Sequence, residues 1–485
     1  MSEYIRMIRQ ISFSYASLIL TIIINPLLIF LLTRNLTVND YGVYSLFAVT
    51  VSSLVVLLEL GLSQFIITKL PGLPHQKKMS TFFSLMFFEL IFLLAVAVIF
   101  ITPPAQSFLS AIMKIENFSL GLQFLFVIIF ISTLTRLYSA YFVANKKIEL
   151  NSIILFIQQI ILVAILSAVV GFGELTILRV VVIWLFSSVV AIVLYSLKSR
   201  DVFSVLKSWR IEMSVVVPAL IFSMPVIFIF LGSLIIEMGN RYVLNYFTNP
   251  ATVGIFSLGY SLINLIYVLG ATVSNVLQPY IAEAWNRKGD HNLLFNIALK
   301  YNIVTILPFM AFMLSLGYQV VGMISGPAYA DAAAIMPFLI PFPLFAAMVF
   351  LFYQNILLRG RTKIIPAIYI TSAAINIALN ILLISRFGMY GAAIATTVSY
   401  FIMFLMMYFY CKKHVSIDYR YLAVHKVLTA AVVSGLVMWL LNPQVLVEKI
   451  AVFALGFLVY AALLFVFKVF DKREIKIINR LRGKK

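Results

Sequence analysis

Apolar runs of about 20 residues recur along the whole chain and alternate with short polar segments, and each is long enough to cross about 30 Å of hydrocarbon as an α-helix. None of the polar connections is long enough to fold as a domain of its own. The pattern predicts fourteen membrane spans, at about residues 11–32, 42–67, 80–101, 119–143, 150–170, 176–197, 216–238, 253–281, 296–317, 331–357, 364–384, 389–410, 422–441 and 446–467.

Composition agrees with this pattern. Of the 485 residues, 63% are hydrophobic and 11% are charged, against about 25% charged residues in soluble domains. The first apolar run is longer than a signal-peptide core and is followed by no small-residue cleavage site, so we expect it to be retained as the first span. The predicted fold class is all-α, a polytopic membrane protein.

The basic residues indicate an orientation for these spans. With the N-terminus inside, 28 of the 36 Lys and Arg residues fall in inner segments and 6 in outer ones. Lys and Arg favour the cytoplasmic side, so both termini are predicted to be cytoplasmic. Topology and attraction to anionic membrane lipids account for the net charge of +19, and nucleic acid is not an expected partner.

A weak internal repeat indicates two halves. "YGVYSL" (41–46) and "VGIFSL" (253–258) are 212 residues apart, and a Phe-Gly pair recurs at an offset of 215. Corresponding spans keep one orientation, so the halves would be related by an axis along the membrane normal. We predict an N-terminal lobe at 1–200 with spans 1–6, a C-terminal lobe at 201–415 with spans 7–12, and an addition at 416–485 with spans 13 and 14 and a basic cytoplasmic tail.

Polar side chains follow one face of several predicted spans at helical spacing. Hydrogen bonding between helices explains one or two such stripes. Stripes on corresponding spans of both halves fit a water-accessible cavity between the lobes better, and Asn25, Asn264 and Asn376 are candidate cavity residues. In span 10, the prolines of "PFLIPFP" (337–343) predict a bent or broken helix.

Three charged residues are predicted deep in the membrane: Glu59 of "VVLLELGLSQF", Glu89 and Arg136. Counted from the inner surface at about 1.5 Å per residue, all three lie roughly 12–14 Å deep on neighbouring spans. Buried charges in membranes usually pair or face a water-filled cavity. Two acids and one guanidinium leave one acid without a full partner, and that acid can take up a proton.

We therefore predict that Glu59 or Glu89 couples ion or proton binding to a conformational switch. Arg136 would hold the other acid ionised and attract an anionic substrate. The alternative is a static pair that only fastens helices together.

Motifs of catalysis are missing from the sequence. It has no Walker A pattern, no HExxH and no Cys/His cluster, and the outer loops are too short to hold a catalytic fold. We therefore expect no enzyme activity and no cofactor. A transporter accounts for the repeat, the cavity and the buried charges together, whereas a passive scaffold leaves the charges unexplained.

Several segments resemble one transporter family. "YASLILTIIINPLLIFLLTRNLTVNDYGVYSLF" followed by "LELGLSQFI" resembles the start of the polysaccharide and O-antigen flippases of the multidrug/oligosaccharidyl-lipid/polysaccharide exporter superfamily. "NRYVLNYFTNPATVGIFSLGYSL" (240–262) and "RFGMYGAAIATTVSY" (386–400) resemble later segments of the same family. The resemblance covers most of the chain.

The resemblance implies a two-lobed transporter of fourteen helices in the bacterial inner (cytoplasmic) membrane. It would move undecaprenyl-diphosphate-linked oligosaccharide from the inner to the outer leaflet for lipopolysaccharide O-antigen or capsule-type polysaccharide, by alternating access driven by H+ or Na+. The implied partners are the lipid-linked oligosaccharide, membrane lipids and the polysaccharide polymerase machinery. A multidrug antiporter and a flippase for lipid-linked peptidoglycan precursors are the alternatives within the superfamily.

The outer side carries a few arginines. Members of that family often have an acidic residue directly before the Arg-Tyr of span 7, where this chain has Asn240, so Arg241 is expected to be freer to meet an anion. We predict that Arg34, Arg241 and, less strongly, Arg386 give the outer side of the cavity a positive potential that receives the diphosphate. Contact with lipid headgroups is the alternative.

Overall fold

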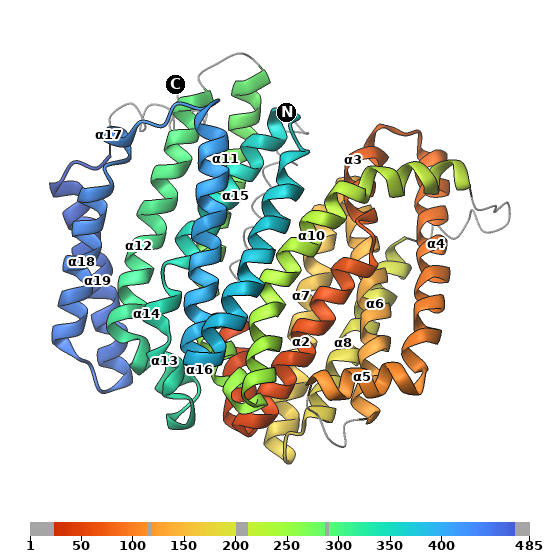
Figure 1. The fold of residues 1–485 in the computed structure, drawn as a ribbon, viewed down its shortest axis with the longest axis horizontal. Coiled ribbons are helices and arrows are strands. Elements are labelled where there is room, and N and C mark those ends of the chain that lie inside the picture. Colours follow the sequence, from red (N-terminus) through yellow and green to blue (C-terminus); the bar gives the residue numbers. More distant parts are fainter. Residues whose placement is uncertain (1–23, 114–118, 200–211, 287–290, 471–485) are drawn as a thin grey trace. The chain divides into compact units, whose positions relative to one another are not determined.

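The computed structural model describes residues 24–113, 119–199, 212–286 and 291–470. Every regular element in these ranges is a helix (Figure 1). Most of predicted span 1 and of the basic tail lies outside the described residues. The chain divides into two compact units, Met1–Ile255 and Phe256–Lys485, which we describe separately as unit 1 and unit 2.

Unit 1 begins with a helical segment at residues 24–35 and contains eight further α-helices among its described residues, besides the first residues of α11. They are α2 (Val38–Leu58), α3 (Leu62–Lys69), α4 (His75–Ile101), α5 (Pro103–Met113), α6 (Ser119–Ala144), α7 (Ile148–Phe172), α8 (Ile177–Lys198) and α10 (Met213–Phe247), with a 3-10 turn η1 (Leu70–Gly72) after α3.

Helix α6 lies at the centre of unit 1, where it packs against α2, α3, α4, α7 and α8. Its Tyr138 and Phe142 contact Tyr195 of α8, with ring centroids 6.0 and 5.1 Å apart, and Tyr138 also contacts Phe82 of α4. These four rings are at most 3% exposed. In lipid, such close packing holds helices together in place of a hydrophobic driving force. The position of Arg136 on α6 is fixed by this packing.

Helix α10 groups with unit 1 by its contacts with α2, α3, α4 and α5. Tyr242 of α10 forms a hydrogen bond with Thr50 of α2. At the other end, Ser80 of α4 donates to Glu212, the residue before α10, over 2.6 Å. Predicted span 7 thus packs on spans 2 and 3, whereas the predicted lobes at 1–200 and 201–415 remain a prediction.

Unit 2 contains the remainder of α11 (Pro250–Asn286) and the helices that follow. They are α12 (His291–Ile324), η3 (Pro327–Tyr329), α13 (Asp331–Ala334), α14 (Met336–Leu339), α15 (Phe342–Leu358), α16 (Ile364–Lys412), α17 (Tyr419–Leu422), α18 (Val424–Leu441) and α19 (Leu446–Val466). The last two lie side by side, and α18 packs along α12 (Figure 1).

The C-terminal helices are fastened to α12 at one end. Asn296 of α12 donates to the carbonyl oxygen of Ser416 and accepts from the N–H of Asp418, both over 2.9 Å. One turn along, the buried ammonium of Lys300 donates to the carbonyl oxygen of Val469, beyond the end of α19. These bonds satisfy polar backbone groups that lipid cannot satisfy.

Helix α16 is two membrane spans joined at a sharp reversal. Its 49 residues contain Gly388 in a non-helical conformation, with φ 55° and ψ −130°. A Cβ at Gly391 would overlap the carbonyl group of Leu383, so the two arms approach closely beside the reversal. Only glycine adopts such a backbone without strain. The two arms match predicted spans 11 and 12.

Eleven helices in the described part of the chain are long and apolar enough to cross a membrane. The pair Pro327–Leu339 and Phe342–Leu358, bent by 51°, forms a further broken span. This pair is predicted span 10, and its prolines produce the break expected there. If α16 is counted as two spans and the partly described first span is added, the total number of spans is consistent with fourteen. That number remains a prediction. The protein is a multi-pass membrane protein.

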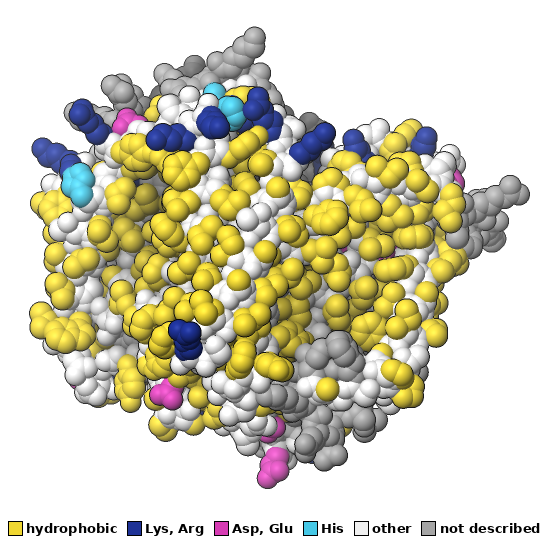
Figure 2. All heavy atoms as spheres, viewed as in Figure 1, with side chains coloured by type: hydrophobic (Ala, Val, Ile, Leu, Met, Phe, Trp, Pro, Cys, Tyr) yellow, Lys and Arg dark blue, Asp and Glu magenta, His cyan; other side chains and the backbone are white. Residues whose placement is uncertain are grey.

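The surface of each unit agrees with this assignment. Figure 2 shows hydrophobic side chains over most of the visible face of each unit, with most of the visible Lys and Arg side chains at one end. Exposed large apolar residues include Val98, Phe186 and Trp439. Such a surface is stable in hydrocarbon and would aggregate in water.

The first residues of α11 cross α2 at a pair of glycines. A Cβ at Gly42 would overlap the carbonyl oxygen of Pro250, and a Cβ at Gly254 would lie 2.7 Å from the carbonyl oxygen of Val38. Gly42 and Gly254 are also the equivalent glycines of the 212-residue repeat. Only glycine allows the two backbones to approach this closely at these positions.

Candidate functional site

Predicted span 2 is broken in the middle of the sequence Glu59-Leu60-Gly61. Helix α2 ends at Leu58, and α3 begins at Leu62. Leu60 and Gly61 both have positive φ, at 53° and 70°. The continuous span predicted at 42–67 is therefore wrong, because hydropathy does not register the backbone conformation of a short connection.

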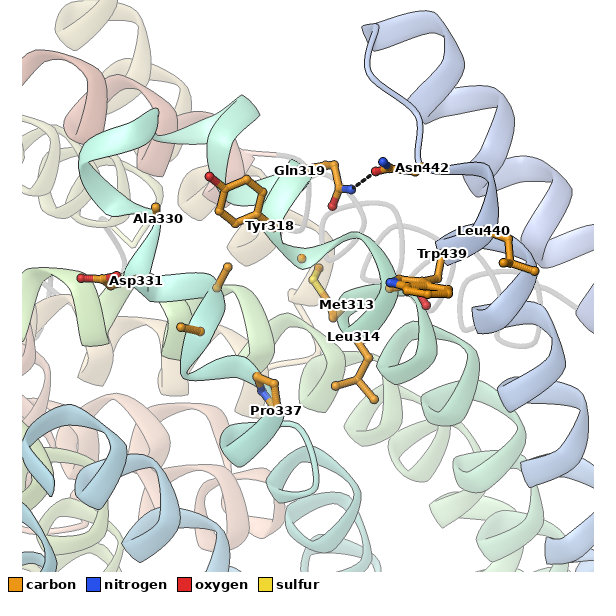
Figure 3. A pocket seen from close by; sticks show the side chains of 14 residues that line it. Met313, Leu314, Tyr318, Gln319, Ala330, Asp331, Pro337, Trp439, Leu440 and Asn442 are labelled. Atoms are coloured by element: carbon orange, nitrogen blue, oxygen red, sulfur yellow. Dashed lines mark hydrogen bonds between the residues drawn. The ribbon is translucent and has the colours of Figure 1, made fainter.

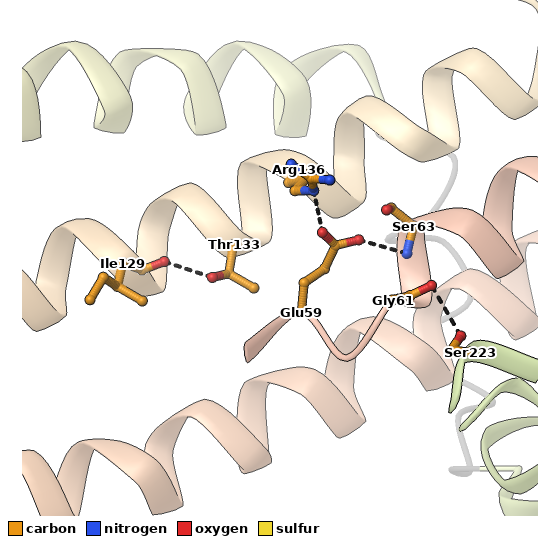
Figure 4. A network of polar contacts seen from close by, with 7 residues as sticks. All are labelled: Glu59, Gly61, Ser63, Ile129, Thr133, Arg136 and Ser223. Carbon is orange, nitrogen blue, oxygen red and sulfur yellow. Dashed lines mark hydrogen bonds and ion pairs between the residues drawn. The ribbon is translucent and has the colours of Figure 1, made fainter. Parts of the chain in front are cut away.

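The carboxylate of Glu59 stabilises this break by binding the first turn of α3. Its Oε1 accepts a hydrogen bond of 2.8 Å from the backbone N–H of Ser63, in the first turn of α3 (Figure 4). The first N–H groups of a helix have no partner within that helix, and a carboxylate at this position also interacts favourably with the helix dipole. Glu59 is fully buried.

The second oxygen of the same carboxylate faces Arg136. Glu59 Oε2 forms an ion pair with Arg136 Nε, and Figure 4 shows the guanidinium reaching Glu59 from α6. The structure thus brings together two of the three residues that the depth count placed at one level. The Arg136 side chain is 39% exposed, and its guanidinium lies 6.0 Å from the ring of Phe230 on α10. Arg136 therefore connects a fully buried acid with an accessible surface.

Glu89 of α4 lies close enough to Glu59 for the two carboxylates to interact electrostatically. It is fully buried, and within the described ranges neither of its oxygens has a hydrogen-bond partner. A buried charge without a partner is costly. With one guanidinium and two acids, the cluster is electrically neutral only when one acid carries a proton.

Helix α10 supports the break from the other side. Ser223 donates a hydrogen bond of 3.0 Å to the carbonyl oxygen of Gly61 (Figure 4). A Cβ at Gly61 would lie 3.1 Å from the Cβ of Ser223, so the two backbones approach closely. In the membrane core, interrupted backbone groups need such partners. The break is thus held by α6 through Arg136 and by α10 through Ser223.

Arg241, on α10, has a partner that sequence reasoning missed. It is 7% exposed, and its Nη1 donates to the carbonyl oxygen of Glu237, 2.9 Å away. The carboxylate of Glu237, one turn earlier, interacts electrostatically with the same guanidinium. The expectation of a freer Arg241 is therefore wrong. The i, i+4 spacing of Glu237 and Arg241 is the signal that identifies this pair.

The other predicted site residues lie in different surroundings. Asn376 is fully buried, donates to Ser399 over 3.0 Å and accepts from Asn380, so it joins the two arms of α16. This bonding is the interhelical kind that was the alternative for such a stripe. Asn25 and Asn264 are half-buried, whereas Arg34 and Arg386 are exposed. Arg34 lies over the ring of Phe30.

The part of the chain that the structure describes contains no arrangement of side chains suited to a metal ion. No group of three His, Cys, Asp or Glu side chains there is arranged to hold a metal ion.

The fold is similar to that of known transporters. It matches the lipid II flippase MurJ in an inward closed conformation with a TM-score of 0.76, at 16% identity, over 95% of this chain and 98% of that one. A multidrug resistance MATE family transporter of the MOP superfamily, in an inward-facing conformation, matches with a TM-score of 0.63 at 14% identity, over 80% of this chain and 94% of that one. At these identities the similarity establishes the fold alone.

Two curated proteins are related to parts of the chain. An uncharacterized membrane protein of Methanocaldococcus jannaschii is 28% identical over 188 residues, 38% of this chain and 36% of that protein. The probable low-salt glycan biosynthesis flippase Agl15 of Haloferax volcanii is 18% identical over 247 residues, 49% of this chain and 52% of that protein. The matched regions thus span about half or less of these relatives.

The family assignment rests on a longer match. Residues 31–334, which include the helix break, Glu89, Arg136 and the whole of α10, match a family of polysaccharide biosynthesis proteins. This region is more than half of the chain, and the transporter fold of both units agrees with it. The protein therefore belongs to the polysaccharide biosynthesis protein family.

Proposed function

We propose that the protein is a flippase that moves a lipid-linked oligosaccharide from the inner to the outer leaflet of the cytoplasmic membrane, for the synthesis of a surface polysaccharide. The family assignment supports a role in polysaccharide biosynthesis. The similarity to a lipid II flippase in fold and to a probable glycan flippase in sequence supports movement of a lipid-linked sugar. An undecaprenyl-diphosphate carrier, a bacterial inner membrane, cytoplasmic termini and a polymerase as partner belong to this proposal.

The observation that carries the proposal is the acidic cluster at the helix break. Glu89 has no hydrogen-bond partner among the described residues and lies beside a broken span, so uptake of one proton there would change the charge of the cluster at the break. We infer that Glu89 takes up the coupling proton, while Glu59 stays paired with Arg136. With Glu89 protonated the cluster is neutral; with Glu89 ionised the two like charges repel each other.

Repulsion between the Glu59 and Glu89 carboxylates is expected to act on the break between α2 and α3. Glu59 holds the first turn of α3 through Ser63, and Ser223 holds Gly61. A displacement of the Glu59 carboxylate therefore changes the angle between α2 and α3 and the fit of α10 on the break. Discontinuous helices form the substrate and coupling-ion sites of many alternating-access transporters.

Cationic side chains are assigned to substrate handling. The accessible part of Arg136 is suited to an anionic group such as a diphosphate, because a guanidinium binds phosphate oxygens in a bidentate manner. Arg34, Arg241 and Arg386 are proposed to contribute positive potential on the outer side. For Arg241 the nearby Glu237 competes with any anion, so its contribution depends on that pair.

Reconstitution tests the proposed function. Purified protein in vesicles would be given a lipid diphosphate-linked oligosaccharide that carries a fluorophore, and its movement between leaflets would be followed by loss of accessibility to a membrane-impermeant quencher. We expect movement in vesicles with the protein and none in vesicles without it. No movement of any lipid-linked saccharide would overturn the proposal.

The two alternatives separate in the same assay. A multidrug antiporter, as the likeness to MATE transporters allows, would move an organic cation and leave the lipid-linked sugar in place. A flippase for peptidoglycan precursors would move a lipid-linked muropeptide faster than a lipid-linked neutral oligosaccharide.

A further inference from the structure

A pocket of about 710 Å³ lies in unit 2 and shares no lining residue with the charged cluster of unit 1. Three segments form its walls: the end of α12 at residues 313–319, the segment at 330–337 that contains α13, and the end of α18 with Asn442 after it. Figure 3 shows it between α12 and α18. Its volume falls in the range of about 300–1,000 Å³ that is usual for small-molecule sites.

Two aromatic rings line this pocket and remain accessible. Tyr318 comes from α12 and Trp439 from α18, and they are 68% and 62% exposed (Figure 3). Aromatic residues are common near the membrane surface for reasons unrelated to ligands. Here, however, they flank a cavity whose lining also includes the polar side chains of Ser315, Gln319 and Asn442, and each ring has an apolar face that a ligand can cover.

One polar atom at the pocket lacks a hydrogen-bond donor. Gln319 donates from Nε2 to Asn442 Oδ1 over 3.1 Å, which fixes the orientation of its amide (Figure 3). The other atom of that amide, Oε1, is buried, and no hydrogen-bond partner for it occurs among the described residues. A buried acceptor without a donor destabilises the folded chain. A ligand with an O–H or N–H group would satisfy it.

Charge excludes one class of ligand. Among the described residues that line the pocket, Asp331 is the one charged side chain, and none is Lys or Arg. Phosphate groups are bound by cations or by convergent N–H groups, and Asp331 would repel them. A phosphorylated ligand is therefore not expected, and an uncharged ligand with hydroxyl donors and with apolar faces that stack on aromatic rings fits the lining.

We propose that this pocket is a binding site for a neutral saccharide, with Trp439 and Tyr318 as stacking surfaces and Gln319 Oε1 as an acceptor for a sugar hydroxyl. The proposal concerns a second site and goes beyond translocation at the charged cluster. It does not require that the protein move any substrate.

Binding to the purified full chain in detergent tests the proposal. The probes are maltotriose and chitotriose, two neutral trisaccharides, and binding is measured by saturation-transfer NMR and calorimetry. We expect at least one of them to bind. Trp439→Ala should weaken it about tenfold or more, and Gln319→Leu by about threefold to tenfold, the effect of losing a ring contact or one hydrogen bond.

Matched variants keep the test specific. Trp439→Tyr retains an aromatic ring and should retain most of the binding. Phe186→Ala removes a ring of α8 that is 51% exposed and belongs to unit 1, and it should leave binding unchanged. Thermal unfolding of each variant verifies that the chain is folded.

Several outcomes would overturn the proposal. Neither trisaccharide binding, or equal binding to the parent chain and to Trp439→Ala, excludes a saccharide site here. Binding of tetramethylammonium that depends on Trp439, without binding of a trisaccharide, would instead assign the pocket to an ammonium group. Because the assay involves no transport, a negative result here leaves the proposed flippase activity untouched, and failure of transport leaves this proposal untouched.

Discussion

Glu59 and Arg136 form an ion pair at the one point where the α2–α3 span loses its helical backbone. The acid lies at the end of α2, and the base lies on α6, a helix fixed by aromatic packing in the core of unit 1. The same carboxylate binds the first turn of α3. One side chain thus links three helices, which explains why a charge is retained in an otherwise apolar run.

A double-mutant cycle should detect this link. We expect Glu59→Gln and Arg136→Ala each to lower the free energy of unfolding by about 1–3 kcal/mol, below the usual cost of breaking a fully buried pair because Arg136 is 39% exposed. The double variant should lose less than the sum of the two. Thermal and denaturant unfolding in detergent measure these values.

The matched control for this cycle is Glu174→Gln, since Glu174 is an exposed acid of unit 1. It should leave stability unchanged. Strict additivity of Glu59→Gln and Arg136→Ala would show that the two side chains do not interact in solution.

The break itself should depend on glycine. Gly61 has a φ of 70°, and a Cβ there would lie 3.1 Å from Ser223. We expect Gly61→Ala to lower the free energy of unfolding by about 1–3 kcal/mol through backbone strain and crowding. Gly171→Ala, at a position where a Cβ meets nothing within 4 Å, should be neutral or stabilising. Equal unfolding temperatures for the two variants would argue against a left-handed residue at 61.

Much of the architecture was predictable because membrane helices must be long and apolar. Predicted spans at 119–143, 150–170 and 176–197 agree with α6, α7 and α8 to within a few residues. The proline-rich break of span 10 also followed from residue chemistry, because proline removes a backbone donor.

The break at Leu60 was not predictable from hydropathy. Leu60 is as apolar as Leu57 and Leu58 of α2, yet it adopts a φ of 53°. Its conformation depends on Arg136 and Ser223, which are distant in the sequence and supply the partners that a broken helix needs.

The site was predictable in part. Counting depth along antiparallel spans placed Glu59, Glu89 and Arg136 at one level, because helix rise converts sequence position into distance. It did not determine which acid pairs with Arg136, since that choice depends on rotation about each helix. For Asn376, spacing alone left open whether it faces a cavity or a neighbouring helix, and the structure places it between the two arms of α16.

The glycine crossing between α2 and the start of α11 should tolerate no side chain. We expect Gly42→Val to separate the two backbones, because its Cβ overlaps the carbonyl oxygen of Pro250. The substitution should lower the free energy of unfolding by about 1–3 kcal/mol or arrest transport. Gly322→Val, on α12 where a Cβ meets nothing within 4 Å, serves as the control. Normal unfolding temperature and normal transport in Gly42→Val would show that the crossing is not required.

The most direct test of the coupling role of Glu89 is lipid-linked oligosaccharide movement in vesicles with and without an imposed pH gradient. The parent chain should respond to the gradient, and Glu174→Gln should respond equally. Glu89→Gln should remain folded, because it removes no described hydrogen bond, and its transport should be slower and independent of the gradient. A full response to the pH gradient in Glu89→Gln, or a response of the parent chain to a Na+ gradient alone, would contradict proton coupling through Glu89.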